Sequence, residues 1–261
     1  MEIIVCIKQV PAITEVRIDP ETNTLVREGV EAAINPFDMY ALEEGIRLRE
    51  RYGGWTTVMS MGPSQAESAL REALALGVDH AILLSDKAFA GADTLATAYT
   101  LACGIRKIGV YDIVICGLKT TDGDTGQVGP GLAEELGMPH VSYVRRIIDI
   151  TGKTLLVERS LEDYYEEIEA PLPSLITVTK EINEPRLPSF KGKMAARKAP
   201  IEVWNSNDLG GVLDRFGIRG SPTQVMKVFN PQPRLKGELL QGNPKSQADQ
   251  LVKRLVEKRL A

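Results

Sequence analysis

The sequence predicts an α/β fold: a mostly parallel, doubly wound, Rossmann-like sheet with helices on both faces, an added antiparallel hairpin and an extended C-terminal arm. Three observations predict it. Between residues 3 and 137, apolar β-branched runs alternate with amphipathic segments, which is typical of a parallel sheet covered on both faces. After Gly137, polar and apolar positions alternate, which indicates antiparallel pairing. Towards the C-terminus, prolines and glycines replace this periodicity.

Strands and helices alternate in the first half of the chain. The strands are expected at the apolar runs 3–10, 56–62, 80–86 and 112–117. The helices that follow them are expected at 35–54, 63–77, 93–109 and 126–137. Asn35 and Pro36 suit the beginning of the first helix, Gly53 suits its end, and Asp93 is a suitable cap for the third.

The second half departs from this pattern. Residues 141–160 alternate around a Thr-Gly-Lys turn and predict a hairpin, and 172–180 is again an apolar strand. The segment 184–200 is rich in proline, lysine and arginine, so we expect a mobile or extended surface segment. Residues 246–261 form an amphipathic pattern, a helix that docks either on its own domain or on another subunit. We therefore divide the chain into an α/β domain, 1–230, and a C-terminal arm, 231–261.

Composition excludes several classes of protein. The chain has 261 residues, 43% of them hydrophobic, and a formal net charge of −4, which does not favour a nucleic-acid binder. No apolar run reaches the roughly 18 residues of a membrane span, so no membrane insertion is expected. The three cysteines, Cys6, Cys103 and Cys116, lack metal-ligand spacing, which predicts buried thiols in a reducing cytoplasm and no metal site.

The loop between the run 112–117 and the next helix, TTDGDTGQVGPG, is unusually rich in glycine and aspartate. Gly123 and Gly126 would let backbone N–H groups approach an anion, Thr125 and Gln127 add side-chain donors, and the next helix directs its positive end there. The alternative is a capped strand-to-helix turn without a ligand. Neither GxGxxG after the first strand nor GxxxxGK[ST] occurs, so the two commonest nucleotide fingerprints do not apply.

Other segments would meet this loop at one edge of the sheet. They are Lys8 to Pro11, Asn35 to Asp38, Met61 to Pro63 and GADTLAT at 91–97. Each alone suits an ordinary turn or cap, but ligands of open parallel sheets bind beyond the carboxyl ends of the strands. The whole edge is therefore a better nucleotide candidate than any single loop.

An ordered set of motifs resembles the β subunit of electron transfer flavoproteins. The motifs are IVCIKQVP, NPFDMYALEEGIRLRE, MGPSQAESALREALALGVD, GADTLATA, DGDTGQVGP, NEPR with the basic stretch through KMAARK, and SPTQV. Residues 157–177 resemble the family's short signature, with Tyr164 departing where a small or acidic residue is expected. The resemblance covers essentially the whole chain and implies an α/β fold, a heterodimer with an α subunit and a bound adenine nucleotide.

The resemblance also assigns nucleotide contacts. They fall on Cys6, Asn35, Asp38, Met61, Gly117, Asp122, Gly123, Asp124, Thr125, Gly126, Gln127 and Val128. Thr94 and Thr97 lie in GADTLAT, a motif of the branch that binds FAD, and are assigned to its phosphate or ribityl groups. In one branch of the family the nucleotide is structural AMP, and in the electron-bifurcating branch it is FAD that accepts hydride from NADH. GADTLAT, DGDTGQVGP and SPTQV favour FAD over AMP.

The resemblance assigns partners as well. NEPRLPSFKGKMAARK resembles a loop that docks an acyl-CoA dehydrogenase-like partner, with Phe190 as its apolar anchor. The basic residues Lys191, Lys193, Arg197 and Lys198 would steer an acidic partner. The alternatives are a Phe190 packed on its own domain and a merely solvated basic face. The C-terminal arm resembles one that wraps the α subunit.

The sequence contains no recognisable nucleophile or acid–base pair, so no catalytic residue is assigned and the chemistry would come from the flavin. In the bifurcating branch, one electron goes through the α-subunit flavin to the dehydrogenase, and the other to ferredoxin or flavodoxin. The alternative is a subunit that binds AMP and supports the α flavin. A nucleotide-binding signalling or ATP-hydrolysing module is a third class, which the ordered motifs disfavour.

Overall fold

A computed structural model describes residues 1–12, 32–227, 237 and 239–260. The chain divides into two compact units, Met1–Met226 and Lys227–Ala261. The first unit contains the sheet and its helices, and the described residues of the second contain one helix.

Within the described residues of the first unit, nine strands form one sheet in the order β11-β5-β4-β1-β6-β10-β7-β8-β9. Neighbours from β11 to β7 are parallel, whereas β7, β8 and β9 are antiparallel. The strands are β1 Glu2–Cys6, β4 Trp55–Met61, β5 His80–Leu84, β6 Ile113–Gly117, β7 His140–Thr151, β8 Thr154–Ser160, β9 Tyr165–Pro171, β10 Ser174–Val178 and β11 Glu202–Trp204.

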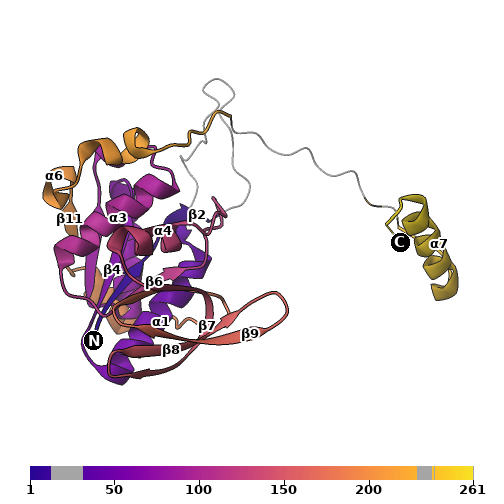
Figure 1. The fold of residues 1–261 in the computed structure, drawn as a ribbon, viewed down its shortest axis with the longest axis horizontal. Helices are drawn as coiled ribbons and strands as arrows, with labels where there is room; N and C mark the ends of the chain where they lie inside the picture. The colour runs from indigo at the N-terminus through magenta and orange to yellow at the C-terminus, as the bar shows by residue number, and fades with distance from the viewer. Residues whose placement is uncertain (13–31, 228–236, 238, 261) are drawn as a thin grey trace. The chain divides into compact units, whose positions relative to one another are not determined.

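Helices cover both faces of this sheet (Figure 1). The helices of the first unit are α1 Pro36–Tyr52, α2 Glu67–Leu76, α3 Thr94–Ile108, α4 Val128–Leu136, α5 Phe190–Ala196 and α6 Ser206–Leu209. Short 3-10 turns occur at Ser64–Ala66, Lys87–Phe89, Leu213–Arg215 and Gly217–Gly220. Successive residues of β1 serve opposite cores: Ile3 and Val5 pack with α1 and α2, and Ile4 and Cys6 pack with α3 and α4. The predicted fold class is confirmed.

Strand order reverses at the centre of the sheet. From β1 the chain passes to β4 and β5 on one side, and then returns to β6 on the other side of β1. The carboxyl ends of β1 and β6 therefore diverge into connections that cover opposite faces. This switch point is where open α/β sheets bind ligands.

The expected strand 3–10 was wrong in its extent. β1 ends at Cys6, and β2 Gln9–Pro11 pairs antiparallel with β3 Ala32–Ile34 in a separate two-stranded sheet. The reason lies at Lys8, whose N–H donates to Asp38 Oδ2 at 2.7 Å and whose carbonyl accepts from Asn35 N at 2.8 Å. These bonds to the start of α1 replace the ladder of the main sheet.

The second half contains more regular structure than expected. The predicted hairpin is present as β7 and β8, but β9 adds a third strand to it. The segment 184–200, expected to be extended or mobile, contains α5, and Ser189 Oγ accepts from Gly192 N at 2.9 Å at its start. The apolar strand predicted at 172–180 is β10, which lies between β6 and β7.

The second unit contains the amphipathic helix α7 Pro244–Glu257. Asn243 Oδ1 caps it by accepting from Ser246 N at 2.9 Å. Leu251, Val252 and Val256 are exposed on this helix. Among the residues that the structure describes, no helix is long and apolar enough to cross a membrane.

Candidate nucleotide-binding site

The predicted site residues gather at the switch point of the sheet. Met61, Cys6 and Gly117 are the last residues of the neighbouring strands β4, β1 and β6. Cys6 is also the register partner of Cys116 across β1 and β6. The three strand ends therefore form one continuous edge from which the surrounding loops leave.

Asn35 connects this edge to the glycine-rich loop. It was expected to cap α1, but its side chain makes no capping bond. Instead Nδ2 donates to the carbonyl of Lys119 at 2.9 Å, and Oδ1 accepts from Thr121 N at 3.1 Å. These two bonds join the start of α1 to the beginning of the loop, and Asn35 is fully buried.

Asp38 is buried on the first turn of α1, where it joins three elements. Its carboxylate accepts from Lys8 N at 2.7 Å, at the end of β1. Burial raises the pKa of this carboxyl to about 7, although hydrogen bonds from Lys8, Asn35 and Gly117 favour the ionised form. A Cβ at Gly117 would meet Asp38 Oδ1 and lie 2.7 Å from the carbonyl carbon of Phe37, so only glycine fits at the end of β6.

The loop after β6 has the backbone of an anion cradle. Asp124 and Gly126 adopt left-handed conformations, with φ of 51° and 63°. Asp124 N donates to the carbonyl of Thr120 at 2.8 Å, which closes a tight turn. Residues 121–125 are exposed, so this turn faces solvent. Left-handed residues in such a turn can direct neighbouring N–H groups towards an anion, although the Asp124 N–H is occupied by Thr120.

The two aspartates of the loop are neutralised by lysines. Lys8 Nζ contacts both carboxylate oxygens of Asp122 at 2.8 and 2.7 Å, and Lys119 Nζ contacts Asp124 Oδ1 at 2.7 Å. Burial opposes ionisation of Asp122, but the hydrogen bond and charge of Lys8 outweigh it and hold its pKa below the usual range. The acidic residues therefore need not repel a phosphate.

The N-termini of α3 and α4 meet at the same edge. Thr94 Oγ1, at the start of α3, donates to Gln127 Oε1, just before Val128 at the start of α4, at 2.9 Å. Thr97, one turn further along α3, is half-buried. The N-termini of α3 and α4 are thus joined side chain to side chain; that of α4 has no side-chain cap, whereas Asp93 caps that of α3.

Asp93 is a residue of this site that the sequence identified only as a cap. Its Oδ1 caps α3, as predicted, by accepting from Leu95 N and Ala96 N at 3.0 and 3.1 Å. Its Oδ2 accepts from Thr223 Oγ1 at 2.8 Å, and its N–H donates to Ser221 Oγ at 2.8 Å. The motifs GADTLAT and SPTQV are therefore in direct contact. Their presence in the same sequence was the signal that could have predicted this contact.

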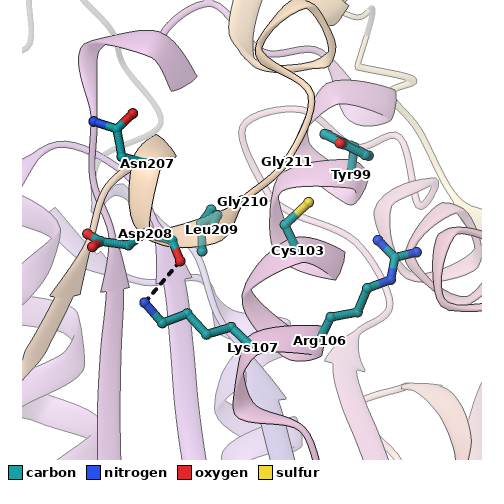
Figure 2. A pocket seen from close by; sticks show the side chains of 9 residues that line it. All are labelled: Tyr99, Cys103, Arg106, Lys107, Asn207, Asp208, Leu209, Gly210 and Gly211. Atoms are coloured by element: carbon teal, nitrogen blue, oxygen red, sulfur yellow. Dashed lines mark hydrogen bonds between the residues drawn. The ribbon is translucent and has the colours of Figure 1, made fainter.

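A cavity of about 400 Å³ lies elsewhere, between α3 and α6 (Figure 2). Its two cations are already used: Lys107 Nζ donates to the carbonyl of Asp208 at 3.0 Å, and Arg106 donates to the carbonyl of Glu135. Both carbonyls belong to the last turns of helices, where a cation is favoured for structural reasons. The cavity contains none of the predicted site residues, so it is distinct from the candidate site at the open edge of the sheet.

The segment predicted to bind a partner presents apolar side chains to solvent. Phe190 is 82% exposed and therefore does not pack on its own domain. Lys191, Lys193, Arg197 and Lys198 around it are exposed as well. Two further apolar side chains were not predicted from the sequence: Leu187 is 90% exposed, and Met194 on α5 is 46% exposed. These three apolar side chains and the surrounding cations form one surface, which we call the α5 surface.

Comparison with known proteins agrees with this architecture. The family described as electron transfer flavoprotein domain matches residues 22–209. An electron transfer flavoprotein subunit beta of Thermoanaerobacterium thermosaccharolyticum is 54% identical, with 98% of both chains covered. The caffeyl-CoA reductase-Etf complex subunit CarD of Acetobacterium woodii is 47% identical over all of both chains. Protein FixA of Azorhizobium caulinodans is 44% identical, over 97% of this chain and 92% of its own. This chain therefore belongs to the electron transfer flavoprotein family, among its β subunits.

Proposed function

We propose that this β subunit binds FAD at the edge formed by β4, β1 and β6, and serves NADH-driven electron bifurcation together with an α subunit. The observation that carries the proposal is the Thr94–Gln127 bond, which joins the N-termini of α3 and α4. One helix N-terminus suits one phosphate, as in AMP. Here the uncapped N-terminus of α4 lies beside the hydroxyl of Thr94 on α3, a second polar group that suits the pyrophosphate of a dinucleotide. FAD contains such a pyrophosphate and AMP does not.

The residues divide by position along this edge. Cys6, Asn35, Asp38, Met61 and Gly117 would surround the adenosine end, where Gly117 lets the start of α1 pack closely against the end of β6. The backbone of Asp122 to Val128 would hold phosphate, and Thr94 and Thr97 would hold phosphate or ribityl hydroxyls. When bound, FAD supplies the redox chemistry, accepting a hydride from NADH and passing on its two electrons separately.

The proposed partners follow from the exposed surfaces. The α5 surface combines apolar anchors with cations, which suits docking of an acyl-CoA dehydrogenase-like protein. A relative named as a subunit of a caffeyl-CoA reductase-Etf complex supports a partner of this kind. Ferredoxin or flavodoxin would take the second electron. The cysteines Cys6, Cys103 and Cys116 are free and buried, which is consistent with the proposed cytoplasmic location.

The proposal is tested by the nucleotide content of the heterodimer. The complex is purified with its α partner and denatured, and the released FAD and AMP are quantified per heterodimer. Two FAD with little AMP is the expected result, and NADH should then reduce both flavins anaerobically. One FAD with one AMP would replace the proposal with a structural AMP site on a subunit that supports the α flavin.

A further inference from the structure

The segment 184–200 is fixed at both ends although its centre is exposed. At its C-terminal end, Arg71 Nη1 of α2 donates to the carbonyls of Ala196 and Ala199 at 2.8 and 3.3 Å. Gly192 packs so closely that an added Cβ would meet the carbonyl of Ala75. The helix α5 is therefore seated on α2, and its outer side carries the exposed side chains of the α5 surface.

At its N-terminal end, Arg186 is held by two carboxylates of α1. Nε and Nη2 donate to the two oxygens of Glu43 at 2.8 and 3.1 Å. Nη1 and Nη2 donate to the two oxygens of Glu50 at 2.6 and 3.0 Å. Glu43 and Glu50 are seven residues apart and so lie on one side of the helix. The guanidinium is thus gripped in two bidentate pairs, the geometry that fixes both position and orientation.

The same carboxylate also fixes the backbone. Glu43 Oε2 accepts from Arg186 N at 3.1 Å, directly before the exposed Leu187. The side chain of Glu43 is only 4% exposed, and Arg47 Nε donates to it as well, at 2.7 Å. Upstream, Asn183 Nδ2 donates to Glu44 Oε2 and to the carbonyl of Tyr40, at 2.9 and 3.0 Å. The chain is therefore immobilised over several residues before it reaches the α5 surface.

These ion pairs contribute little net stability, because solvent screens the half-exposed Glu50 pair and desolvation offsets the attraction of the buried Glu43. Their clearest effect is therefore to impose one geometry. We propose that Arg186 is a positioning residue: with Glu43 and Glu50 it forms a clamp that holds Leu187 and Phe190 in the arrangement that the dehydrogenase partner binds. A surface ordered in advance loses less conformational freedom on binding than a free loop does. This inference rests on the docking role proposed above for the α5 surface.

The test uses four variants of the heterodimer. Arg186→Gln removes the clamp, and Arg186→Lys keeps the charge but cannot make two bidentate pairs. Glu50→Gln weakens one half of the clamp at a half-exposed position, which protects the test if Arg186→Gln fails to fold. Arg51→Gln is the matched control, because Arg51 also lies near the end of α1 but pairs weakly with Asp149, at 3.5 Å.

Two readouts separate positioning from folding. Amide hydrogen exchange at residues 187–195 should become about tenfold faster in both Arg186 variants, less so in Glu50→Gln, and stay unchanged in Arg51→Gln. The KM for an acyl-CoA dehydrogenase that the wild-type heterodimer reduces should rise about tenfold, with kcat and NADH-driven dye reduction retained. Wild-type behaviour of Arg186→Lys in both readouts would overturn the clamp, since charge alone would then suffice.

The two proposals fail in different ways. If the wild-type heterodimer reduces no acyl-CoA dehydrogenase, the proposed partner is wrong, whereas the exchange measurement still decides whether Arg186 holds the segment. If exchange accelerates while KM stays constant, the clamp orders the segment but has no role in docking, and the inference is overturned.

Discussion

Asp38 places an ionisable group inside the candidate site. The carboxyl is 4% exposed, and it receives the N–H of Lys8 at the point where β1 leaves the main sheet. Because burial raises its pKa to about 7, its charge changes near neutral pH rather than near pH 4. The charge at this edge of the sheet therefore changes with pH near neutrality.

The free energy of unfolding of the heterodimer should depend on pH through Asp38. The folded chain holds the Asp38 proton up to about pH 7, while the unfolded chain loses it near 3.8. The folded state thus binds more protons in this window, so stability falls as pH rises from about 4 to 7, by an amount on the order of a few kcal/mol. Urea denaturation at several pH values should show a shallower fall in Asp38→Asn. Parallel curves for wild type and variant would contradict the assignment.

Gly117 offers a sharper steric test. In Gly117→Ala the new methyl would lie 2.7 Å from the carbonyl carbon of Phe37 and 2.9 Å from Asp38 N, backbone atoms that cannot move independently. We expect a loss of about 1–3 kcal/mol of stability and of bound adenine nucleotide. Released nucleotide per heterodimer is the measurement.

Gly131→Ala is the control, since its Cβ would lie 3.3 Å from the Ala98 methyl and alanine favours the helix α4. Equal nucleotide content in Gly117→Ala and wild type would mean that the end of β6 does not border the nucleotide.

At the scale of elements, α5 presents side chains that the core would normally hide. Phe190 and Leu187 are 82% and 90% exposed, on a segment that α1 and α2 hold in place. A lone exposed hydrophobic residue is ordinary, but several on one immobilised segment are typical of an interface.

Phe190→Ala should therefore weaken docking without affecting the nucleotide. Truncating an apolar anchor typically costs 1–2 kcal/mol or more, so we expect the KM for the dehydrogenase to rise about tenfold. Steady-state reduction of the dehydrogenase at varied concentration measures it. Val110→Ala is the control, because Val110 is 77% exposed but follows α3, which covers the other face of the sheet from α5. An unchanged KM in Phe190→Ala would remove this residue from the interface.

Local sequence patterns predicted elements well where they agreed with tertiary contacts. The helices at 35–54 and 93–109 correspond to α1 and α3, because the signals used were local: Pro36 and Gly53 at the ends of α1, and the Asp93 cap of α3. The break after β1 could not be predicted, since Lys8 turns away from an apolar run to meet Asp38, thirty residues later. For the same reason Asn35 was expected as a cap, although its side chain instead contacts residues 119 and 121.

The ion pairs of the glycine-rich loop could not be predicted from the sequence either. The loop aspartates were noted, but not their lysine partners. Asp122 pairs with Lys8, which is distant in the sequence, and Asp124 pairs with Lys119 in the loop itself. The β9 strand was missed because residues 165–171 are rich in glutamate and resemble an exposed loop. β9 lies at the edge of the sheet, where its glutamates discourage pairing with other chains.

At the scale of the whole molecule, α7 is an amphipathic helix with an exposed apolar side in its own unit. Leu251, Val252 and Val256 are 49%, 58% and 57% exposed. If this side docks on the α subunit, Leu251→Asp combined with Val252→Asp should weaken the heterodimer at least tenfold, because charges would be buried unpaired. Sedimentation velocity over a concentration series measures the dissociation constant. Lys253→Asp, on the polar side, is the control, and an unchanged constant in the double variant would exclude α7 from the interface.

The position of β10 has a consequence for biosynthesis. β10 lies between β6 and β7, yet it is made after both, at residues 174–178. Until the ribosome has released these residues, β6 has an open edge and the three-stranded meander cannot join the parallel core. Open edges of apolar strands are templates for aggregation. A chain stopped after residue 173 should therefore accumulate in the insoluble fraction or on chaperones, whereas one stopped at residue 227 should not, which fractionated pulse-labelled translation can measure.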